Sequence, residues 1–180
     1  RLTAIDTAIV MNEKFVLDGS VDYPSLFYLT VNGVNGRIPL MIENEELDLI
    51  LDNKIISNTT LKGSESHDIY QGFNTKLSDL KNKLSIAREN LRQSIFLRDS
   101  SNIDSDRELT EKLNKEFLEF PLEYIEDNKD SYAVLPLLKT QMNLANLDSA
   151  KYALLNNCCF HVVVFKLLNT CDYHVVFNLL

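Results

Sequence analysis

The sequence predicts an α+β fold, in which a small antiparallel β-sheet or sandwich precedes a long helical hairpin and short C-terminal helices. Up to about residue 64, apolar residues recur at every second position, which is typical of half-buried strands. From residue 66 they recur at every third or fourth position, which is typical of amphipathic helices. We therefore expect a β part at 1–64, a helical part of the same domain at 65–157, and an atypical apolar tail at 158–180.

Several short strands are predicted in the first third. In one of them Phe27, Leu29 and Val31 share a face, and polar or aromatic residues alternate with them. The predicted strands are Phe15–Gly19, Leu26–Val31, Ile38–Asn44, Leu47–Leu51 and Leu61–Ser64. The connecting segments are rich in Asn, Gly and Glu, so a simple antiparallel meander is the expected topology. Pro39 donates no hydrogen bond, which predicts an edge strand or a bulge there.

The switch to helical spacing falls at Gly63 and Ser64, where Gly ends the strand and Ser caps the helix. One apolar stripe then extends to Ile95. Its members are Ile69, Phe73, Leu77, Leu80, Leu84, Ala87, Leu91 and Ile95. A helix of this length needs a second helix to cover its apolar face.

The second helix is predicted after the polar segment 99–102. Ser105 and Glu108 have the spacing of a capping box, and Asp104 and Asp106 beside them are interpreted as favourable charges at the helix N-terminus. Pro121 lies inside the pattern and predicts a kink or a restart of the helix. Two short helices are expected to follow, at about 131–142 after an Asp cap and at about 147–155 after an Asn cap.

Composition excludes some classes of partner. The net charge is −8 and the pI is near 4.9, so an acidic surface would repel nucleic acids and anionic membranes. Lys166 and Asp172 interrupt the apolar tail, so we expect no membrane span. The chain begins at Arg1 without a Met, and we expect an upstream segment that could have carried a signal sequence.

Before the tail, a cluster of carboxylates and a single histidine are candidate functional sites. Glu43, Glu45, Glu46 and Asp48 could bind a hard cation, but the spacing lacks the Gly and the alternating ligands of a calcium loop. We interpret them as a solvated turn. His67 has no nucleophile or carboxylate at a catalytic spacing, and we expect it at the surface.

Cysteine and histidine gather only at the end of the chain. Cys158, Cys159, His161, Cys171 and His174 are of the residue types that bind tetrahedral zinc, but no turn chemistry between them brings the two halves together. No Cys-x-x-Cys pair occurs, so one thiol has no partner to resolve a mixed disulfide. We therefore expect no catalytic residue, no metal and no cofactor, and we predict that the chain is not an enzyme.

A family resemblance is carried by short motifs in a fixed order. They are Lys14 and Phe15 with Gly19, then Pro24, Gly36–Leu40, Glu43 with Asn44, and Gly63 with Ser64. Together with the helices that follow, they cover about residues 3 to 155. This arrangement resembles the uncharacterised N-terminal domain that precedes the thioredoxin-like (AhpC/TSA, TlpA/ResA-type) domain of bacterial envelope thiol:disulfide oxidoreductases.

The resemblance implies a non-catalytic accessory domain in the periplasm or cell envelope, which spaces, docks or tethers the redox domain. Its partners would be the missing C-terminal thioredoxin-like domain or another envelope protein. A free-standing module that binds a peptide or a glycan is the first alternative, and an apolar groove on the sheet would favour it. An enzyme is the second, and it would require buried titratable groups that converge in a cleft.

The tail departs from that family. Where the family has a polar linker and a Gly-x-x-Ala-Pro-x-Phe entry to the redox domain, this chain has the apolar, β-prone runs Cys158–Phe165 and Tyr173–Phe177. One hypothesis is that a frame shift or a truncated gene produced this tail. The other is that the two runs pair as a hairpin around Asn169 and Thr170 and add strands to the sheet.

Overall fold

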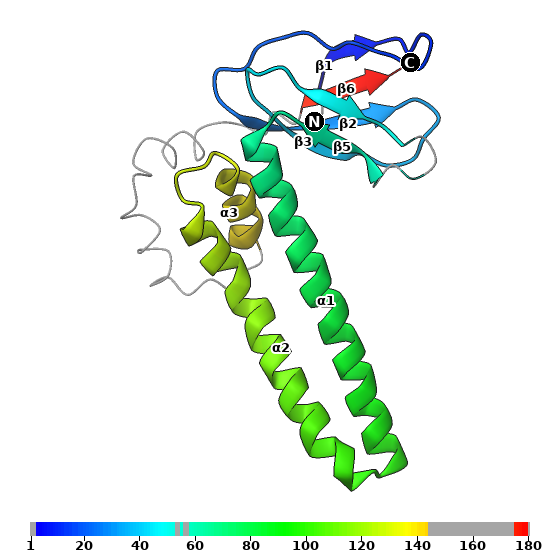
Figure 1. The fold of residues 1–180 in the computed structure, drawn as a ribbon, viewed down its shortest axis with the longest axis vertical. Coiled ribbons are helices and arrows are strands. Elements are labelled where there is room, and N and C mark those ends of the chain that lie inside the picture. The colour runs from blue at the N-terminus through cyan, green and yellow to red at the C-terminus, as the bar shows by residue number, and fades with distance from the viewer. Residues whose placement is uncertain (1–2, 53–54, 56–57, 144–174, 180) are drawn as a thin grey trace. The chain divides into compact units, whose positions relative to one another are not determined.

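The strands β1 to β5 precede the helices α1, α2 and α3, and the strand β6 comes last. In this computed structural model the described residues are 3–52, 55, 58–143 and 175–179 (Figure 1). They divide into two compact units, one formed by residues up to 70 and from 129 onward, the other by residues 71–128. The α+β class predicted from the sequence is confirmed.

The larger sheet has four strands in the order β1-β6-β2-β3 (Figure 1). β2 (Ser25–Val31) and β3 (Ile38–Ile42) form the predicted antiparallel pair. β6 (Val175–Leu179) lies between β1 (Thr3–Ala8) and β2, and is parallel to both. The sheet is therefore mixed, and the simple meander is wrong, because a strand from the far end of the chain enters between two strands of the first third.

β6 lies in the predicted tail, so its position can be compared with the two hypotheses about that tail. The last described strand of the chain belongs to the larger sheet, as the hypothesis of added strands requires, although its partners are β1 and β2. The run Cys158–Phe165 lies outside the described residues, as does the turn at 169–170, so the hairpin itself stays a prediction. The origin of the tail stays a hypothesis as well.

A second, two-stranded sheet consists of β4 (Asp48–Ile50) and β5 (Thr60–Lys62), which are antiparallel, with Leu49 opposite Leu61. The predicted strand Phe15–Gly19 is not formed. Burial still alternates along it, since Phe15 and Leu17 are half-buried and the residues between and after them are exposed. The alternation was predicted correctly, but no strand among the described residues pairs with this segment.

One core lies between the two sheets. Leu29, Ile38 and Leu40 of the larger sheet are buried against Leu61 of the smaller one, together with Ala8. Half-buried apolar residues surround this cluster, namely Phe15, Leu17, Val31, Ile42, Leu47, Leu49 and Leu51. The alternation predicted for β2 and β3 thus places its apolar face as expected.

The turn before residue 15 has the geometry of a tight hairpin. Asn12 and Glu13 both have positive φ, at 52° and 62°, and Met11 and Lys14 exchange two backbone hydrogen bonds of 2.9 and 3.0 Å. Two successive residues with positive φ are typical of a type I′ turn, whose twist matches that of paired strands.

α1 (Glu65–Leu97) begins where the sequence predicts. The Ser64 hydroxyl accepts a hydrogen bond of 2.9 Å from the His67 backbone N–H, which is an N-cap. The Ser64 carbonyl accepts from the Asp68 N–H at 3.1 Å, which is the first bond of the helix. Gly63 precedes this cap with a φ of 91°.

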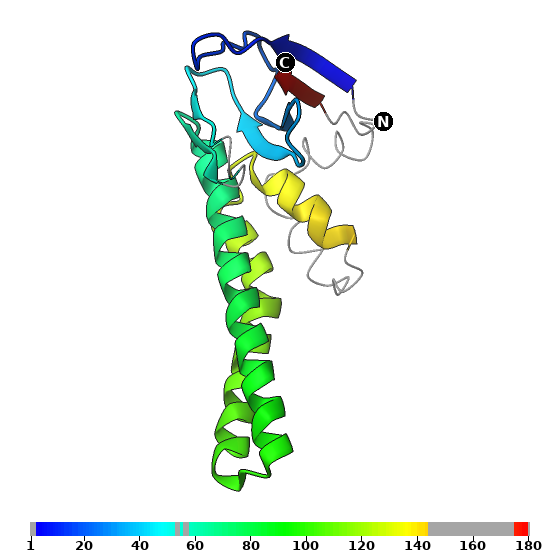
Figure 2. The same cartoon turned by 90° about the vertical axis from the view of Figure 1, so that its right-hand side faces the viewer.

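In the helical unit, α1 from residue 71 packs against α2 (Ser100–Asp127) as an antiparallel hairpin (Figures 1 and 2). Phe73, Phe120 and Tyr124 form an aromatic cluster, with each pair of ring centroids 5.4 Å apart. The predicted stripe is buried at Phe73, Leu80, Leu84 and Ala87, but Ile95 at its end is exposed.

α2 differs from the prediction at its start. It begins at Ser100, and its N-cap is Asp99, whose carboxylate accepts from the Ser101 N–H at 3.2 Å. Ser105 therefore lies inside the helix, where its hydroxyl donates to the Asn102 carbonyl at 3.0 Å. Asp104 and Asp106 do not flank a cap. The predicted cap at Ser105 is therefore wrong: the helix begins earlier, because Asp99 caps it directly after a tight turn at Arg98, whose φ is 54°.

Asp106 instead accepts a hydrogen bond of 2.6 Å from the Ser94 hydroxyl of α1. Pro121 is buried within α2, and the helix does not restart there. α3 (Val134–Asn143) begins three residues after Ser131, whose hydroxyl accepts from the Ala133 N–H. The short helix predicted at 147–155 lies outside the described residues.

α3 belongs to the unit that contains the sheets, and it lies below the larger sheet in both views (Figures 1 and 2). Tyr132, just before α3, stacks on Tyr23, with ring centroids 6.2 Å apart. Ala133, Val134, Leu137 and Leu138 are buried. Among the described residues, no helix is long and apolar enough to cross a membrane.

Candidate ligand pocket

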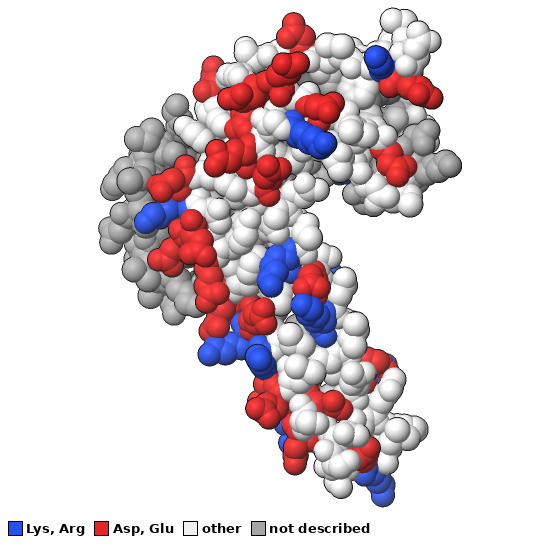
Figure 3. Space-filling view, in the orientation of Figure 1, with Lys and Arg blue, Asp and Glu red and all other residues white. Residues whose placement is uncertain are grey.

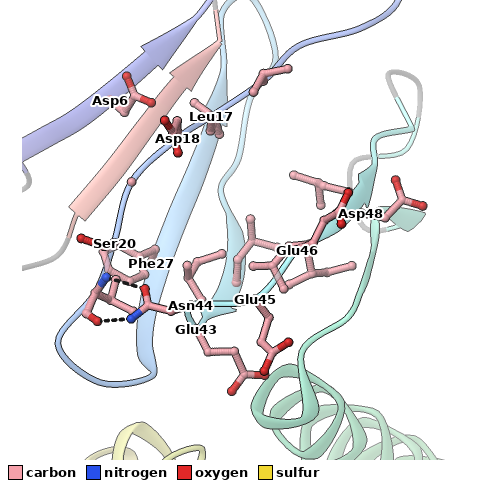
Figure 4. A pocket seen from close by; sticks show the side chains of 18 of the residues that line it. Asp6, Leu17, Asp18, Ser20, Phe27, Glu43, Asn44, Glu45, Glu46 and Asp48 are labelled. Carbon is pink, nitrogen blue, oxygen red and sulfur yellow. Dashed lines mark hydrogen bonds between the residues drawn. The ribbon is translucent and has the colours of Figure 1, made fainter.

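A pocket of about 680 Å³ opens between the segment 15–21 and the stretch from the end of β3 to β4 (Figure 4). Its apolar lining residues are Phe15, Val16, Leu17, Val21, Phe27, Leu40, Ile42, Leu47, Leu49 and Leu61. Phe27, Leu40 and Leu61 are buried core residues, whereas Val16 is 82% exposed. The pocket therefore has an apolar floor that is continuous with the core between the sheets.

Asn44 holds the two walls of this pocket together. Its side-chain oxygen accepts a hydrogen bond of 2.8 Å from the Val21 N–H, and its side-chain nitrogen donates one of 2.6 Å to the Val21 carbonyl (Figure 4). An Asn amide carries the same donor and acceptor as a peptide group. Asn44 thus pairs with Val21 as a strand residue would, and it ties the segment 15–21 to the end of β3.

Six carboxylates line the pocket, and its lining contains no Lys, Arg or His. Four of them are the carboxylates weighed in the sequence, Glu43, Glu45, Glu46 and Asp48. Asp6 of β1 and Asp18 of the segment 15–21 complete the set. The sequence did not reveal these two, because they join the others only when β1 and that segment fold next to the β3–β4 connection.

The carboxylates are not arranged as a metal centre. Among the described residues, no group of three or more His, Cys, Asp or Glu side chains is placed to hold a metal ion. Glu43 accepts a hydrogen bond of 2.9 Å from the Ser66 hydroxyl in the first turn of α1, so this carboxylate is anchored. Glu45, Glu46 and Asp48 are exposed. Their common effect is a negative potential at the mouth of an apolar pocket.

His67 is buried, with 4% of its surface exposed, so its predicted surface position is wrong. Its Nδ1 accepts a hydrogen bond of 3.3 Å from the Met41 backbone N–H, while the Ser64 hydroxyl donates one of 3.2 Å to the Met41 carbonyl. The first turn of α1 therefore pairs both backbone groups of Met41, which lies on the edge strand β3. A covered edge no longer offers these groups to another chain.

Burial lowers the pKa of His67 from its usual value, and the charge of neighbouring Asp68 opposes this shift. An unprotonated Nδ1 is what the Met41 N–H requires as acceptor. The burial of His67 was missed because it follows from the position of this residue in the helix. His67 is the third residue of the helix, and Ser64, its cap, lies next to β3, so the imidazole faces the sheet edge and is shielded from water.

The cysteines and histidines weighed as a zinc site, Cys158, Cys159, His161, Cys171 and His174, all lie outside the described residues. The expectation that they form no zinc site therefore stays a prediction.

A comparison with known families shows which part of the chain is similar to a described domain. A model described as a domain of unknown function (DUF4369) matches residues 1–70. The comparisons with curated proteins and with solved structures found no match. The matched range contains β1 to β5, all residues that line the pocket, and the contact between His67 and Met41. The first part of the chain is therefore similar to an uncharacterised domain, and the pocket lies wholly within it.

Proposed function

We propose that this chain is a non-catalytic accessory domain of a thioredoxin-like thiol:disulfide oxidoreductase of the bacterial envelope, and that it docks or spaces the redox domain. The observation that carries the proposal is the match of residues 1–70 to an uncharacterised domain, over a range that contains all of the short motifs resembling the accessory domains of such enzymes. The sequence has no Cys-x-x-Cys pair, so the redox chemistry would belong to another domain.

The helical unit supports a docking role. Ile95, Phe96 and Leu97 follow one another at the end of α1, and all three are exposed; Phe96 is 84% exposed. We call these three residues the hairpin tip. Consecutive exposed apolar residues are typical of surfaces that another protein covers.

The second helix adds a charged surface. α2 carries nine acidic and three basic residues, whereas α1 carries four acidic and five basic ones. Figure 3 shows acidic side chains along the helical unit, with basic side chains between them. The acidic character of the helical hairpin is thus carried by α2, which would steer a basic partner surface toward the hairpin.

A binding assay tests the proposal. A thioredoxin-like domain of the TlpA/ResA type, preferably one encoded in the same gene or beside it, is titrated into the chain by calorimetry. We expect binding that Phe96→Ser weakens roughly tenfold, since an exposed aromatic anchor is removed. Leu118→Ser is the matched control, because Leu118 is an exposed apolar residue of α2 away from the hairpin tip. Lack of binding by the unsubstituted chain would refute the docking role.

An activity assay accompanies it. The chain alone should not accelerate insulin reduction by dithiothreitol, because its thiols lack the paired spacing that lowers a thiol pKa. Turnover above the dithiothreitol blank that disappears on replacing Cys158 and Cys159 by Ser would contradict the non-catalytic assignment.

A further inference from the structure

We propose that the pocket binds an extended peptide segment in which Lys or Arg side chains alternate with large apolar ones. The inference concerns residues 6–61, all within one compact unit, and it does not depend on the proposed docking of a redox domain. The sequence leaves two ligand classes open for a free-standing binding module, a peptide or a glycan. Of these two, the proposed ligand is a peptide.

The first argument is size and polarity. A volume of about 680 Å³ lies within the range of roughly 300–1,000 Å³ that ligand pockets usually have. The floor is formed by core side chains such as Phe27 and Leu61, and Val16 adds an exposed apolar wall. A ligand that fills this space gains affinity by placing apolar groups on that floor.

The second argument is charge. Six of the residues that line the pocket carry carboxylates, and no Lys, Arg or His lies among the lining residues. A neutral glycan or an acidic peptide would remove water from these groups without returning a charged partner. A Lys or Arg side chain would replace that water by charge-assisted hydrogen bonds. The pocket therefore discriminates in favour of a cationic ligand.

The third argument concerns the backbone. The segment Phe15–Gly19 alternates half-buried and exposed residues as a strand does, yet no strand among the described residues pairs with it. An extended peptide lying beside this segment would pair with it as an added strand, and every second side chain of the peptide would point into the pocket. A small cationic molecule could contact the carboxylates and the apolar floor of the pocket, but it could not form strand pairing with the segment Phe15–Gly19.

The experiment is a titration of the full chain into a short fluorescein-labelled peptide in which Lys and Leu alternate, followed by fluorescence anisotropy at low salt. A peptide in which Glu replaces each Lys is the first control. We expect a dissociation constant in roughly the micromolar range for the Lys peptide. We expect it to be about tenfold weaker at physiological salt, because the exposed charges are then screened.

Paired substitutions separate the pocket from general electrostatics. Glu45→Gln with Glu46→Gln removes two charges from the pocket, and we expect the Lys peptide to bind roughly tenfold more weakly. Glu111→Gln with Glu126→Gln removes two exposed charges from α2, and should change the affinity less than about twofold. Both double variants have the same net charge, so a difference between them reports the pocket.

A further variant leaves all carboxylates in place. Val16→Lys puts a cation at the pocket wall on an exposed residue, so the fold tolerates it, and it should repel the Lys peptide. Ile86→Lys is its control, because Ile86 is an exposed apolar residue of α1 that does not line the pocket.

The proposal is overturned by any one of the following results. These are equal binding of the Glu peptide, equal affinity of the pocket and α2 double variants, or no binding of the Lys peptide up to about millimolar concentration. A chain that binds an oligosaccharide array but not the Lys peptide would identify the other ligand class and likewise overturn it. No redox domain is present in this assay. None of these outcomes therefore bears on the proposed docking of a redox domain, which is tested separately by calorimetry.

Discussion

We expect the substitution His67→Ala to lower the free energy of unfolding by about 2–4 kcal/mol near neutral pH. The imidazole is buried, and its Nδ1 is the acceptor for the Met41 N–H at 3.3 Å. Leaving that N–H unpaired costs about 1–3 kcal/mol. The cavity left by a buried ring adds to the loss, although partial collapse of the site limits it, which together gives about 2–4 kcal/mol.

His67→Asn is the matched variant. The Asn side-chain oxygen takes the place of Nδ1 and accepts a hydrogen bond, but it does not titrate. We therefore expect His67→Asn to lose about 1 kcal/mol less than His67→Ala near neutral pH, since the Met41 N–H keeps an acceptor.

The pH dependence follows from the lowered pKa of His67. Above the usual value of 6.5 the imidazole is neutral in both folded and unfolded chains, so its contribution to stability is fully present. As the pH falls below that value, the unfolded chain binds the proton first, and stability is lost until the pH passes the folded-state pKa. Each unit by which burial lowers the pKa costs about 1.4 kcal/mol at low pH.

The assay is urea unfolding at several pH values between about 8 and 5, together with amide exchange at Met41. The stability advantage of the unsubstituted chain over His67→Asn should shrink as the pH falls, and Met41 should exchange faster. An advantage that is the same at both ends of this pH range would refute the burial argument. Unchanged exchange at Met41 in His67→Ala would refute the hydrogen bond.

Three further predictions concern the stability of the fold. Gly63→Ala should lower stability by about 2–4 kcal/mol in urea unfolding, because φ is 91° and the new Cβ would lie 2.5 Å from the Glu46 carbonyl oxygen; a neutral effect would contradict that contact. Asp99→Ala should cost about 1 kcal/mol and Ser105→Ala less, and the reverse order would restore the predicted cap at Ser105. A chain ending at Asn157 lacks β6, an interior strand of the larger sheet, and should show a much lower midpoint of thermal unfolding; an unchanged midpoint would place the tail outside the fold.

Local patterns predicted much of the fold. The change of period at Gly63 and Ser64 located the start of α1, because a cap and a backbone reversal are properties of a few neighbouring residues. Pro39 predicted an edge or a bulge, and β3 is an edge strand of the larger sheet. The start of α2 was predicted wrongly, because Ser105 and Glu108 have the spacing of a capping box although Asp99 is the residue that caps the helix.

The candidate site was only half visible in the sequence. The carboxylates at 43–48 are neighbours in the chain, and they were recognised as a group. Asp6 and Asp18 come to the same pocket from other segments, and His67 reaches Met41 across 26 residues of sequence. Such contacts depend on which helix or strand packs against which other one. The periodicity of apolar residues predicts which face of an element is buried, but it does not predict the element that covers this face.

By itself the sequence determined the α+β class, the apolar faces of β2, β3 and α1, and the lack of a Cys-x-x-Cys pair, because each of these depends on residue type and spacing along the chain. Only the tertiary structure decided that β6 enters the sheet between β1 and β2, that the segment 15–21 stays apart from the ladder and walls a pocket, and that His67 is buried at the edge of β3. The reason is that strand partners and burial are set by contacts between distant segments, whose free energy depends on the packing of the whole unit.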